Sequence, residues 1–264
     1  MRDSGLSEAI DAVGGVTELA RRIGIAQPSV SNWDCVPVDR VIAVEAATGV
    51  SRVRLRPDLY RKDFVAGDVD SIDSARSQEY ALLSALLMGA PSKALLKRLA
   101  QVRGDATPLG LAHAALGQSA EATDVAEAER EYFHLFIGLG RGELLPYASY
   151  YLTGFLHERP LARLREDLAR LGIERVEGHY EPEDHAATLC EIMAKFARHD
   201  FPAPENAQGD FFKKHIAPWM IRMFTDMERT NGVTFYQHVG TLGRVFLNIE
   251  AEAFMLAEQE AIKH

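Results

Sequence analysis

Apolar residues recur every three or four positions along most of the chain, which is the period of an amphipathic α-helix. Over residues 6–50 this pattern predicts four short helices, interrupted at Gly14-Gly15 and at Gly24 and stopped at Gly49. The N-terminal part of the chain is therefore expected to be a compact group of short helices.

Two segments break the helical pattern. Residues 51–59 carry arginine at every second position, at Arg52, Arg54 and Arg56, and this spacing predicts an extended arm. Residues 65–77 are small, acidic and poorly periodic, which is typical of a linker. We therefore expect a domain at 1–64, a linker at 65–77 and a second domain at 78–264.

From Gln78 onward the pattern is helical throughout. A stripe of leucines, for instance, ends at Gly172, which is a good C-terminal cap; its members are Leu161, Leu164, Leu168 and Leu171. A long final helix is predicted over residues 234–262. Alternating apolar and polar runs with turn dipeptides between them do not occur, so the fold class is all-α, with a larger helical bundle after the small N-terminal domain.

The same two parts of the chain differ in net charge. The formal net charge of the whole chain is −9. Residues 1–64 hold nine Lys/Arg and nine Asp/Glu, so the entire excess of negative charge lies in residues 65–264. A neutral head and an acidic body would meet different partners, because net charge sets long-range attraction.

The cysteines and histidines exclude several classes of protein. Cys35 and Cys190 are far apart, which argues against a disulfide framework and suits the reducing cytoplasm. Histidine and cysteine never fall at zinc-ligand spacing, so neither a metal nor another cofactor is expected. The apolar runs are too short to span a bilayer and no export signal is visible, so we expect a cytoplasmic protein without membrane insertion.

Residues 16–34 have the features of a helix-turn-helix. Ala20 is small and Gly24 is flexible, which suits two helices that cross at a tight turn, while Ile25 and Val30 would anchor the second helix. Short polar side chains would then project towards base edges, at Gln27, Ser29, Ser31 and Asn32. Phosphate contacts would come from Arg21 and Arg22 and from the three arginines of the arm.

Residues 6–60 resemble the Cro/YdaS-like family of DNA-binding domains. The resemblance rests on Val13-Gly14-Gly15, Leu19-Ala20, Ile23-Gly24-Ile25, Val30-Ser31-Asn32-Trp33, the run from Ile42 to Gly49 and Leu55-Arg56-Pro57-Asp58. It implies DNA as a partner and is compatible with a homodimer, because such heads usually bind two half-sites. Asp34 and Cys35 depart from the pattern, and a small helical domain without DNA binding is the alternative.

Three segments of the body are rich in aromatic residues, glycine or acids. Residues 131–147 begin as a helix with Tyr132 and Phe136 on one face and continue into a glycine-rich loop, which lacks the strand and Lys-Ser/Thr of a phosphate-binding loop. Residues 181–185 place acids at the start of an amphipathic helix, where they also favour the helix dipole. A core stripe explains the third set, namely Phe211, Phe212, His215, Trp219 and Phe224.

Residues 78–264 resemble the TorD/DmsD family of redox-enzyme maturation chaperones. The specific blocks are Glu-Tyr-x-x-Leu-Phe-x-Gly at 131–138, Gly-Glu-Leu-Leu-Pro-Tyr at 142–147 and Glu-Pro-x-Asp-His at 181–185. The resemblance implies a chaperone that binds the precursor of a molybdenum-containing oxidoreductase, both its twin-arginine signal peptide and its apoprotein, and supports cofactor insertion before export. A formate dehydrogenase is one such client.

A twin-arginine peptide needs a receptor with acids beside an apolar groove. The candidates for client-peptide binding are Tyr132, Phe136, Tyr147, Glu181, Glu183, Asp184 and His185, with the roles of Asp184 and His185 carried over from the family motif. No nucleophile–base pattern appears, so we expect no catalytic residues and no enzyme. The alternative is a transcriptional regulator in which the body senses the state of the client or its cofactor.

Overall fold

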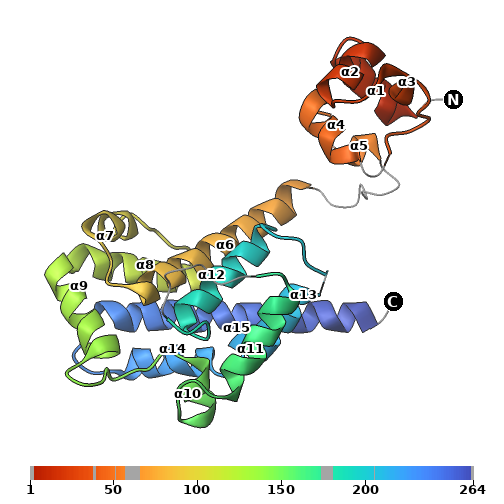
Figure 1. The fold of residues 1–264 in the computed structure, drawn as a ribbon. Helices are drawn as coiled ribbons and strands as arrows, with labels where there is room; N and C mark the ends of the chain where they lie inside the picture. The colour runs from red at the N-terminus through yellow and green to blue at the C-terminus, as the bar shows by residue number, and fades with distance from the viewer. Residues whose placement is uncertain are drawn as a thin grey trace. The chain divides into compact units, whose positions relative to one another are not determined.

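The computed structural model describes residues 3–37, 40–50, 52–56, 66–173, 181–204 and 206–262. Within these ranges the regular elements are all helices, and the only strand-like pairing is a single bridge between Tyr147 and His185. The chain divides into two compact units, Met1–Asp70 and Ser71–His264 (Figure 1). The all-α prediction is confirmed for this part of the chain.

The first unit is built from five short helices: α1 Ser4–Ala12, α2 Val16–Arg22, α3 Gln27–Ser31, α4 Val41–Thr48 and α5 Arg52–Leu55. Their apolar faces form one core, in which Leu6, Leu19, Val30 and Leu55 are fully buried. Gly24 has a φ of 71°, a left-handed angle that glycine adopts without strain, and it makes the turn between α2 and α3. The predicted helix-turn-helix is therefore present.

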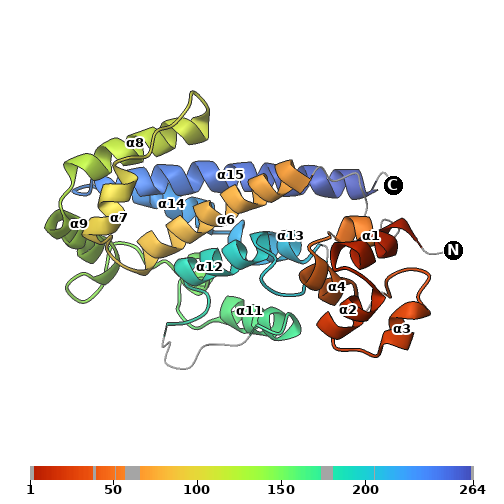
Figure 2. The same ribbon diagram turned by 90° about the horizontal axis from the view of Figure 1, so that it is seen from above.

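Apart from the first residues of α6, which precede its boundary, the second unit contains the remaining described helices, including two π-helical turns. They are α6 Ala66–Met88, α7 Lys93–Leu99, α8 Pro108–Ala122, α9 Val125–Tyr132, η2 Phe133–Ile137, α10 Ala148–Thr153, α11 Arg159–Arg170, α12 Ala186–Ala197, α13 Ala207–Phe211, η3 Phe212–Ile216, α14 Met220–Arg229 and α15 Phe235–Ile262. The long helix α15 runs through this unit, with α8 and α14 packed along it (Figures 1 and 2).

Close packing around α15 depends on small residues at the contacts. A Cβ atom on Gly243 would lie 2.4 Å from the ring of Phe224, and one on Gly240 would lie 2.8 Å from the backbone of Glu228. These glycines let α14 approach α15 closely. The largest fully buried side chains, such as Trp219, fill the space between the helices, and burial of a side chain of this kind contributes about 1.5–3 kcal/mol.

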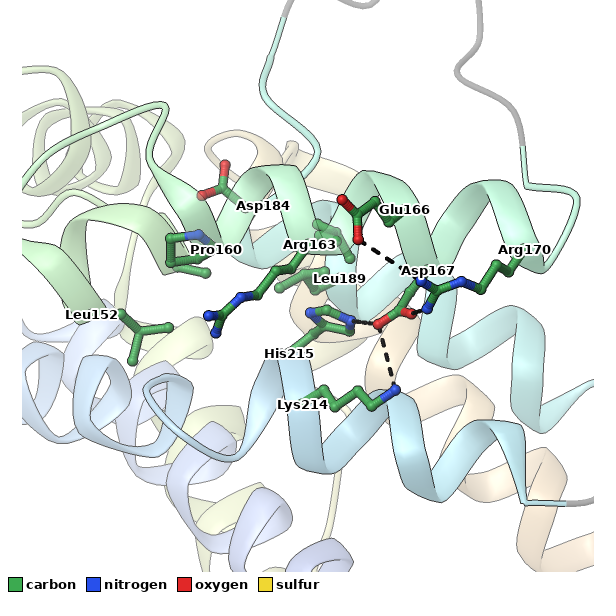
Figure 3. Close-up of a pocket in the computed structure, with 12 residues that line it drawn as sticks. Leu152, Pro160, Arg163, Glu166, Asp167, Arg170, Asp184, Leu189, Lys214 and His215 are labelled. Carbon is green, nitrogen blue, oxygen red and sulfur yellow. Dashed lines mark hydrogen bonds and ion pairs between the residues drawn. The ribbon is translucent and has the colours of Figure 1, made fainter.

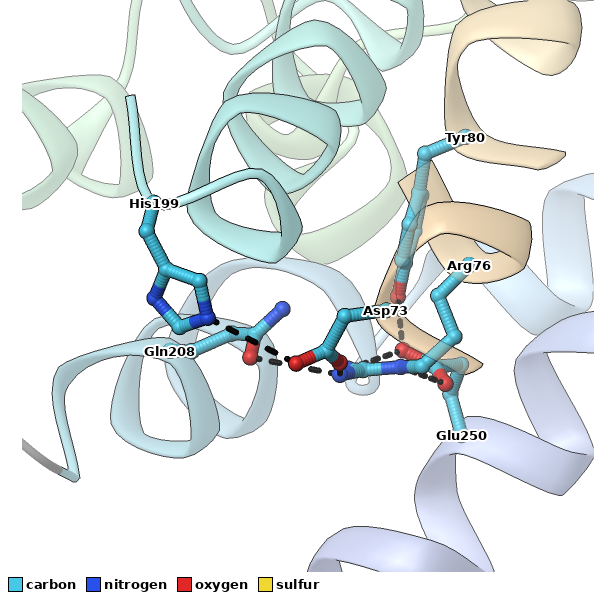
Figure 4. Close-up of polar contacts among 6 residues, drawn as sticks. All are labelled: Asp73, Arg76, Tyr80, His199, Gln208 and Glu250. Atoms are coloured by element: carbon cyan, nitrogen blue, oxygen red, sulfur yellow. Dashed lines mark hydrogen bonds and ion pairs between the residues drawn. The ribbon is translucent and has the colours of Figure 1, made fainter. Parts of the chain in front are cut away.

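Two predicted irregular segments differ from the structure. The linker at 65–77 is helical from Ala66 onward, as the start of α6. Its sequence lacks an apolar stripe, but polar contacts hold it: Arg76 pairs with Glu250 of α15 at 2.8 Å and with Asp73 at 2.7 Å (Figure 4). The extended arm at 51–59 is also different, because residues 52–55 form α5, while 57–59 lie outside the described residues.

Candidate functional site

An aromatic cluster lies where α9 passes into the π-helical turn η2. The ring of Tyr132 is 4.9 Å from that of Phe136 and 6.0 Å from that of Tyr236 on α15. The Tyr132 hydroxyl donates to the carbonyl of Leu87 at 3.3 Å. Tyr132 and Phe136 are therefore half-buried and fixed from two sides, as a platform at the edge of the core.

The glycine-rich loop after η2 folds back on that turn. Gly138, with a φ of 63°, donates its N–H to the carbonyl of Phe133 at 2.7 Å. Leu144 then donates to the carbonyl of Leu135 at 2.8 Å, and a Cβ on Gly142 would lie 2.5 Å from that same oxygen. Glycine is required for these close approaches, so the loop serves backbone packing.

The end of this loop pairs with the Glu-Pro-x-Asp-His segment. Ala148 donates its N–H to the carbonyl of Asp184 at 3.0 Å, and Ala186 donates to the carbonyl of Pro146 at 2.8 Å. The ring of His185 lies 4.9 Å from that of Tyr147, edge to face. Two blocks far apart in the sequence thus form one short strand-like contact.

His185 caps the helix that follows it. It precedes α12, and its Nδ1 accepts the N–H of Ala187 at 3.1 Å. The side chain is buried, and burial lowers the pKa of His185 below its usual value. The neutral imidazole is therefore the form that the fold favours.

Two acids of the motif blocks point into the protein. Glu131 accepts the N–H groups of Thr234, Phe235 and Tyr236 at 2.7, 3.3 and 3.0 Å, at the start of α15. Asp184 is 1% exposed and accepts both the N–H and the hydroxyl of Ser149, at the start of α10. Both carboxylates satisfy backbone donors that the first helical turn leaves without partners.

The other two acids lie nearer the surface. Glu183 pairs with Arg165 of α11 at 2.8 Å. Glu181 is exposed and accepts the Tyr147 hydroxyl at 2.6 Å. Burial and the Glu181 carboxylate raise the pKa of Tyr147, and the same two causes raise the pKa of Tyr132.

The structure therefore sorts the seven predicted peptide-binding residues into two groups. Tyr132, Phe136, Tyr147, Glu181 and His185 lie together around the paired loop. Glu183 is directed to α11 and Asp184 to the start of α10.

Three exposed apolar side chains nearby were not predicted from the sequence. Phe133, Ile137 and Leu139 are 45, 53 and 98% exposed, on η2 and the loop that follows it. In a regular helix Phe133 and Ile137 would share a face, but nothing in their spacing shows that this face stays open. The wider turn of the π-helix is a feature often found at functional sites.

A hollow of about 460 Å³ lies between α10, α11, the start of α12 and η3 (Figure 3). Leu152, Pro160 and Leu189 form part of its apolar wall, and Arg163 extends into it. On its floor, Nε2 of the buried His215 lies 2.9 Å from Asp167. The size is typical of a small-molecule pocket.

The His215–Asp167 pair is partly protected from water. Burial lowers the pKa of His215 below its usual value, against the effect of Asp167. Burial acts to raise the pKa of Asp167, but the hydrogen bond with His215 and the charge of Lys214 bring it below its usual value. The predicted core role of His215 and its aromatic neighbours agrees with their burial.

The candidate DNA-binding residues lie on α2 and α3. Gln27, Ser29 and Asn32 are exposed and Ser31 is half-buried, with Gln27 donating to the Ser31 hydroxyl at 2.7 Å. Val30, between them, is fully buried. The polar face predicted from the sequence is therefore the exposed face of α3.

Four arginines of this unit are held by groups of the unit itself. Arg21 and Arg22 both pair with Glu18, at 2.6 and 3.0 Å, and the hydrogen bonds from Arg21 and Arg22 lower the pKa of Glu18 to about 2. Arg54 pairs with Glu8 at 3.0 Å, and Arg56 donates to the carbonyl of Val36 at 2.7 Å. The side chain of Arg52 lies outside the described residues.

The described residues contain no group of three or more His, Cys, Asp or Glu side chains that could hold a metal ion. None of the helices in the described part is both long enough and apolar enough to cross a membrane.

Burial raises the pKa of the Cys190 thiol to about 12, so this cysteine is not in its reactive form.

Two protein families match separate parts of the chain. Residues 103–225 match the family described as nitrate reductase delta subunit, and residues 6–64 match the family described as bacterial toxin YdaS.

Curated relatives are chaperones. Chaperone protein TorD of Vibrio cholerae is 31% identical over 130 residues, which are 46% of this chain and 59% of that protein. Chaperone protein TorD of Shewanella loihica is 26% identical over 229 residues, 82% of this chain and 96% of that protein.

Among solved structures, a redox enzyme maturation protein from Archaeoglobus fulgidus superposes with a TM-score of 0.45 and 20% identity. The superposition covers 66% of this chain and 93% of that one.

Proposed function

We propose that the chain is a dedicated maturation chaperone for an exported molybdenum-containing oxidoreductase, because its body is similar to TorD chaperones and its head matches the YdaS family. In this proposal the body binds the twin-arginine signal peptide of the client and its apoprotein, and supports cofactor insertion before export in the cytoplasm. A formate dehydrogenase is the client class we favour.

One observation supports the proposal most directly: the exposed Glu181 carboxylate lies beside Tyr147 and near the aromatic ring of Tyr132. The exposed Glu181 carboxylate accepts the Tyr147 hydroxyl at 2.6 Å, and an exposed carboxylate can exchange its hydrogen-bond partners for an incoming guanidinium. Arginine and carboxylate pair in a two-pronged geometry that gives both strength and specificity. The adjacent arginines of a signal peptide would therefore meet Glu181.

The apolar part of the peptide would lie on the platform and the turn beside it. Tyr132 and Phe136 present half-buried rings, and Phe133 and Ile137 are exposed on the same turn of chain. Aromatic and aliphatic side chains of this kind supply most of the binding free energy in helix-in-groove recognition.

The test is a calorimetric titration of the full chain with a synthetic twin-arginine signal peptide of the client. We expect micromolar or tighter binding, weakened at least about tenfold when both arginines are replaced by glutamine. Equal affinity for the two peptides would overturn the proposed role of Glu181.

A second activity is proposed for the head, because α3 leaves Gln27, Ser29 and Asn32 exposed while its apolar Val30 is buried. We propose that this face contacts base edges in a major groove. The paired arginines predict weak attraction to phosphate, so binding is expected to be strongest at low salt. A gel shift with the upstream DNA of its own operon tests this, and no shift at low salt would contradict it.

A further inference from the structure

Glu18 on α2 binds both of the adjacent arginines that the sequence predicts as phosphate contacts. Its carboxylate pairs with Arg21 at 2.6 Å and with Arg22 at 3.0 Å, three and four positions further along the same helix. Residues at these spacings lie on one face of an α-helix. The three charged side chains of α2 therefore form a single cluster.

The two arginines are not held equally. Arg21 donates to both oxygens of Glu18, from Nε at 2.8 Å and from Nη2 at 2.6 Å, although its side chain is 71% exposed. Arg22 donates to Glu18 and also, at 3.1 Å, to the carbonyl of Ala47 on α4. Within the described residues the Arg21 guanidinium has no partner other than Glu18, so this acid alone holds it.

The cluster contributes little to the stability of the head. Water screens ion pairs between exposed side chains, and pairs one turn apart on a helix add little to the free energy of folding. The apolar core, in which Leu19 and Val30 are fully buried, supplies the stability instead. We therefore expect Glu18→Gln, which keeps the shape of the side chain, to leave the head folded.

The position of the cluster in the helix-turn-helix suits a contact with the DNA backbone. Arg21 and Arg22 end α2, and the turn at Gly24 follows them and leads into α3 (Figure 1). When such a motif binds DNA, its first helix crosses the sugar-phosphate backbone while its second helix enters the major groove. A free guanidinium at the end of α2 could therefore reach a phosphate beside that groove.

The charged side chains around α2 do not attract DNA by their sum. The helices that pack on α2 are α1, α3 and α4. Together with the cluster, the charged side chains of this neighbourhood are Glu8, Asp11, Asp34, Arg40, Glu45 and Arg54, which pairs with Glu8. Four positive and five negative charges leave it at −1. Attraction to phosphate therefore depends on individual arginines that are free to bind it.

We propose that Glu18 restrains DNA binding by the head, because its carboxylate occupies the Arg21 guanidinium that would otherwise bind a DNA phosphate. Carboxylate and phosphate oxygens compete for the same planar fork of donors. This inference rests on the DNA binding proposed for the head, and it names the residue that regulates that binding.

The consequence is a head whose binding relies on base contacts. Phosphates carry no sequence information, and their attraction supplies most of the non-specific affinity of a DNA-binding protein. With Arg21 occupied, this non-specific share is small, and the exposed polar residues of α3 have more influence on where the head binds. The hydrogen bonds from Arg21 and Arg22 also lower the pKa of Glu18 to about 2, so the acid is ionised at neutral pH.

The experiment measures fluorescence anisotropy of two labelled duplexes with the full chain, one from upstream of its own operon and one unrelated duplex of equal length. We expect Glu18→Gln to bind both duplexes more tightly than wild type, by about tenfold at about 50 mM salt and about threefold at about 200 mM. The plot of log affinity against log salt should become steeper by about 0.9, the value for one additional phosphate contact.

Two further variants separate a free Arg21 from a change in net charge. Asp11→Asn removes an exposed acid of α1 that has no ion pair within the described residues, so it adds the same charge without releasing an arginine. It should change the affinity by less than about twofold and leave the salt dependence unaltered. Glu18→Gln combined with Arg21→Gln should return both the affinity and the salt dependence to those of wild type.

Equal affinity and salt dependence for wild type and Glu18→Gln would overturn the proposed restraint, while binding by wild type would uphold the DNA-binding role of the head. Absence of binding by every variant at low salt would overturn both. A gain matched by Asp11→Asn, or kept in the double variant, would assign the effect to net charge and also contradict the role of Arg21. Circular dichroism of each variant confirms that it is folded.

Discussion

The body and the head place the side chains of their motifs in opposite directions. In the body, Glu131 and Asp184 point inward and bind the first turns of α15 and α10. In the head, Gln27 and Asn32 point outward from α3, over a buried Val30. Glu131 and Asp184 therefore stabilise the body and leave ligand contact to the exposed Glu181, whereas Gln27 and Asn32 would themselves contact the ligand.

The largest effect is expected from Glu131→Ala. Three backbone N–H groups at the start of α15 would lose their acceptor, and buried donors without partners cost about 1–3 kcal/mol each. We expect the free energy of unfolding to fall by about 3 kcal/mol in a urea titration followed by circular dichroism. Glu129→Ala, on the exposed side of α9, is the control and should change it by less than about 0.5 kcal/mol.

Asn32→Ala tests whether the outward-pointing residues of the head contact DNA. A side chain that contacts a base edge is worth about 1–3 kcal/mol of binding free energy, so we expect a loss of about 2 kcal/mol in a gel shift at low salt. Ser7→Ala, exposed on α1, should leave the affinity unchanged. Equal affinities for wild type and Asn32→Ala would remove α3 from the DNA contact.

Asp184→Asn should lower stability without abolishing peptide binding. The amide keeps one oxygen to accept from Ser149 but loses the charge, which predicts a loss of about 1.5 kcal/mol in the free energy of unfolding. Its neighbour Glu183 pairs with a half-exposed Arg165, so Glu183→Gln should cost less than about 1 kcal/mol. A larger loss of peptide affinity with Asp184→Asn than with Glu181→Gln would contradict this assignment.

The smallest effect concerns His113, which lies 2.9 Å from Glu79. The hydrogen bond with Glu79 raises the pKa of His113 above its usual value. A raised pKa in the folded state adds stability that is fully present below the unfolded pKa and is lost as pH rises through the folded pKa. Compared with wild type, His113→Asn should therefore be less stable at pH 6 by a fraction of about 1 kcal/mol and equally stable at pH 9, as measured by thermal unfolding.

Much of the helical architecture followed from apolar spacing and from glycine and proline. The leucine stripe ending at Gly172 became α11, and the final helix begins at Phe235, one residue after the predicted start. The start of α6 could not be predicted in this way, because its residues lack an apolar stripe. Its contacts come from Arg76 with Glu250, which are 174 residues apart in the sequence.

For the candidate peptide site, the sequence could predict which residues lie close together better than which way their side chains point. Spacing placed Tyr132 and Phe136 on one face, and the structure keeps them together at 4.9 Å. The same information could not show that Asp184 turns inward while Glu181 stays exposed. That difference comes from the pairing of Tyr147 with His185, a contact between distant segments.

The central claim is that Glu181 binds the adjacent arginines of a client signal peptide, and a double-mutant cycle measures it most directly. Wild type and Glu181→Gln are each titrated by calorimetry with the twin-arginine peptide and with its twin-glutamine form. We predict that the two changes are not additive, with a coupling of at least about 1.5 kcal/mol, as for close charge pairs at interfaces. Additive losses, or no loss with Glu181→Gln, would contradict the account.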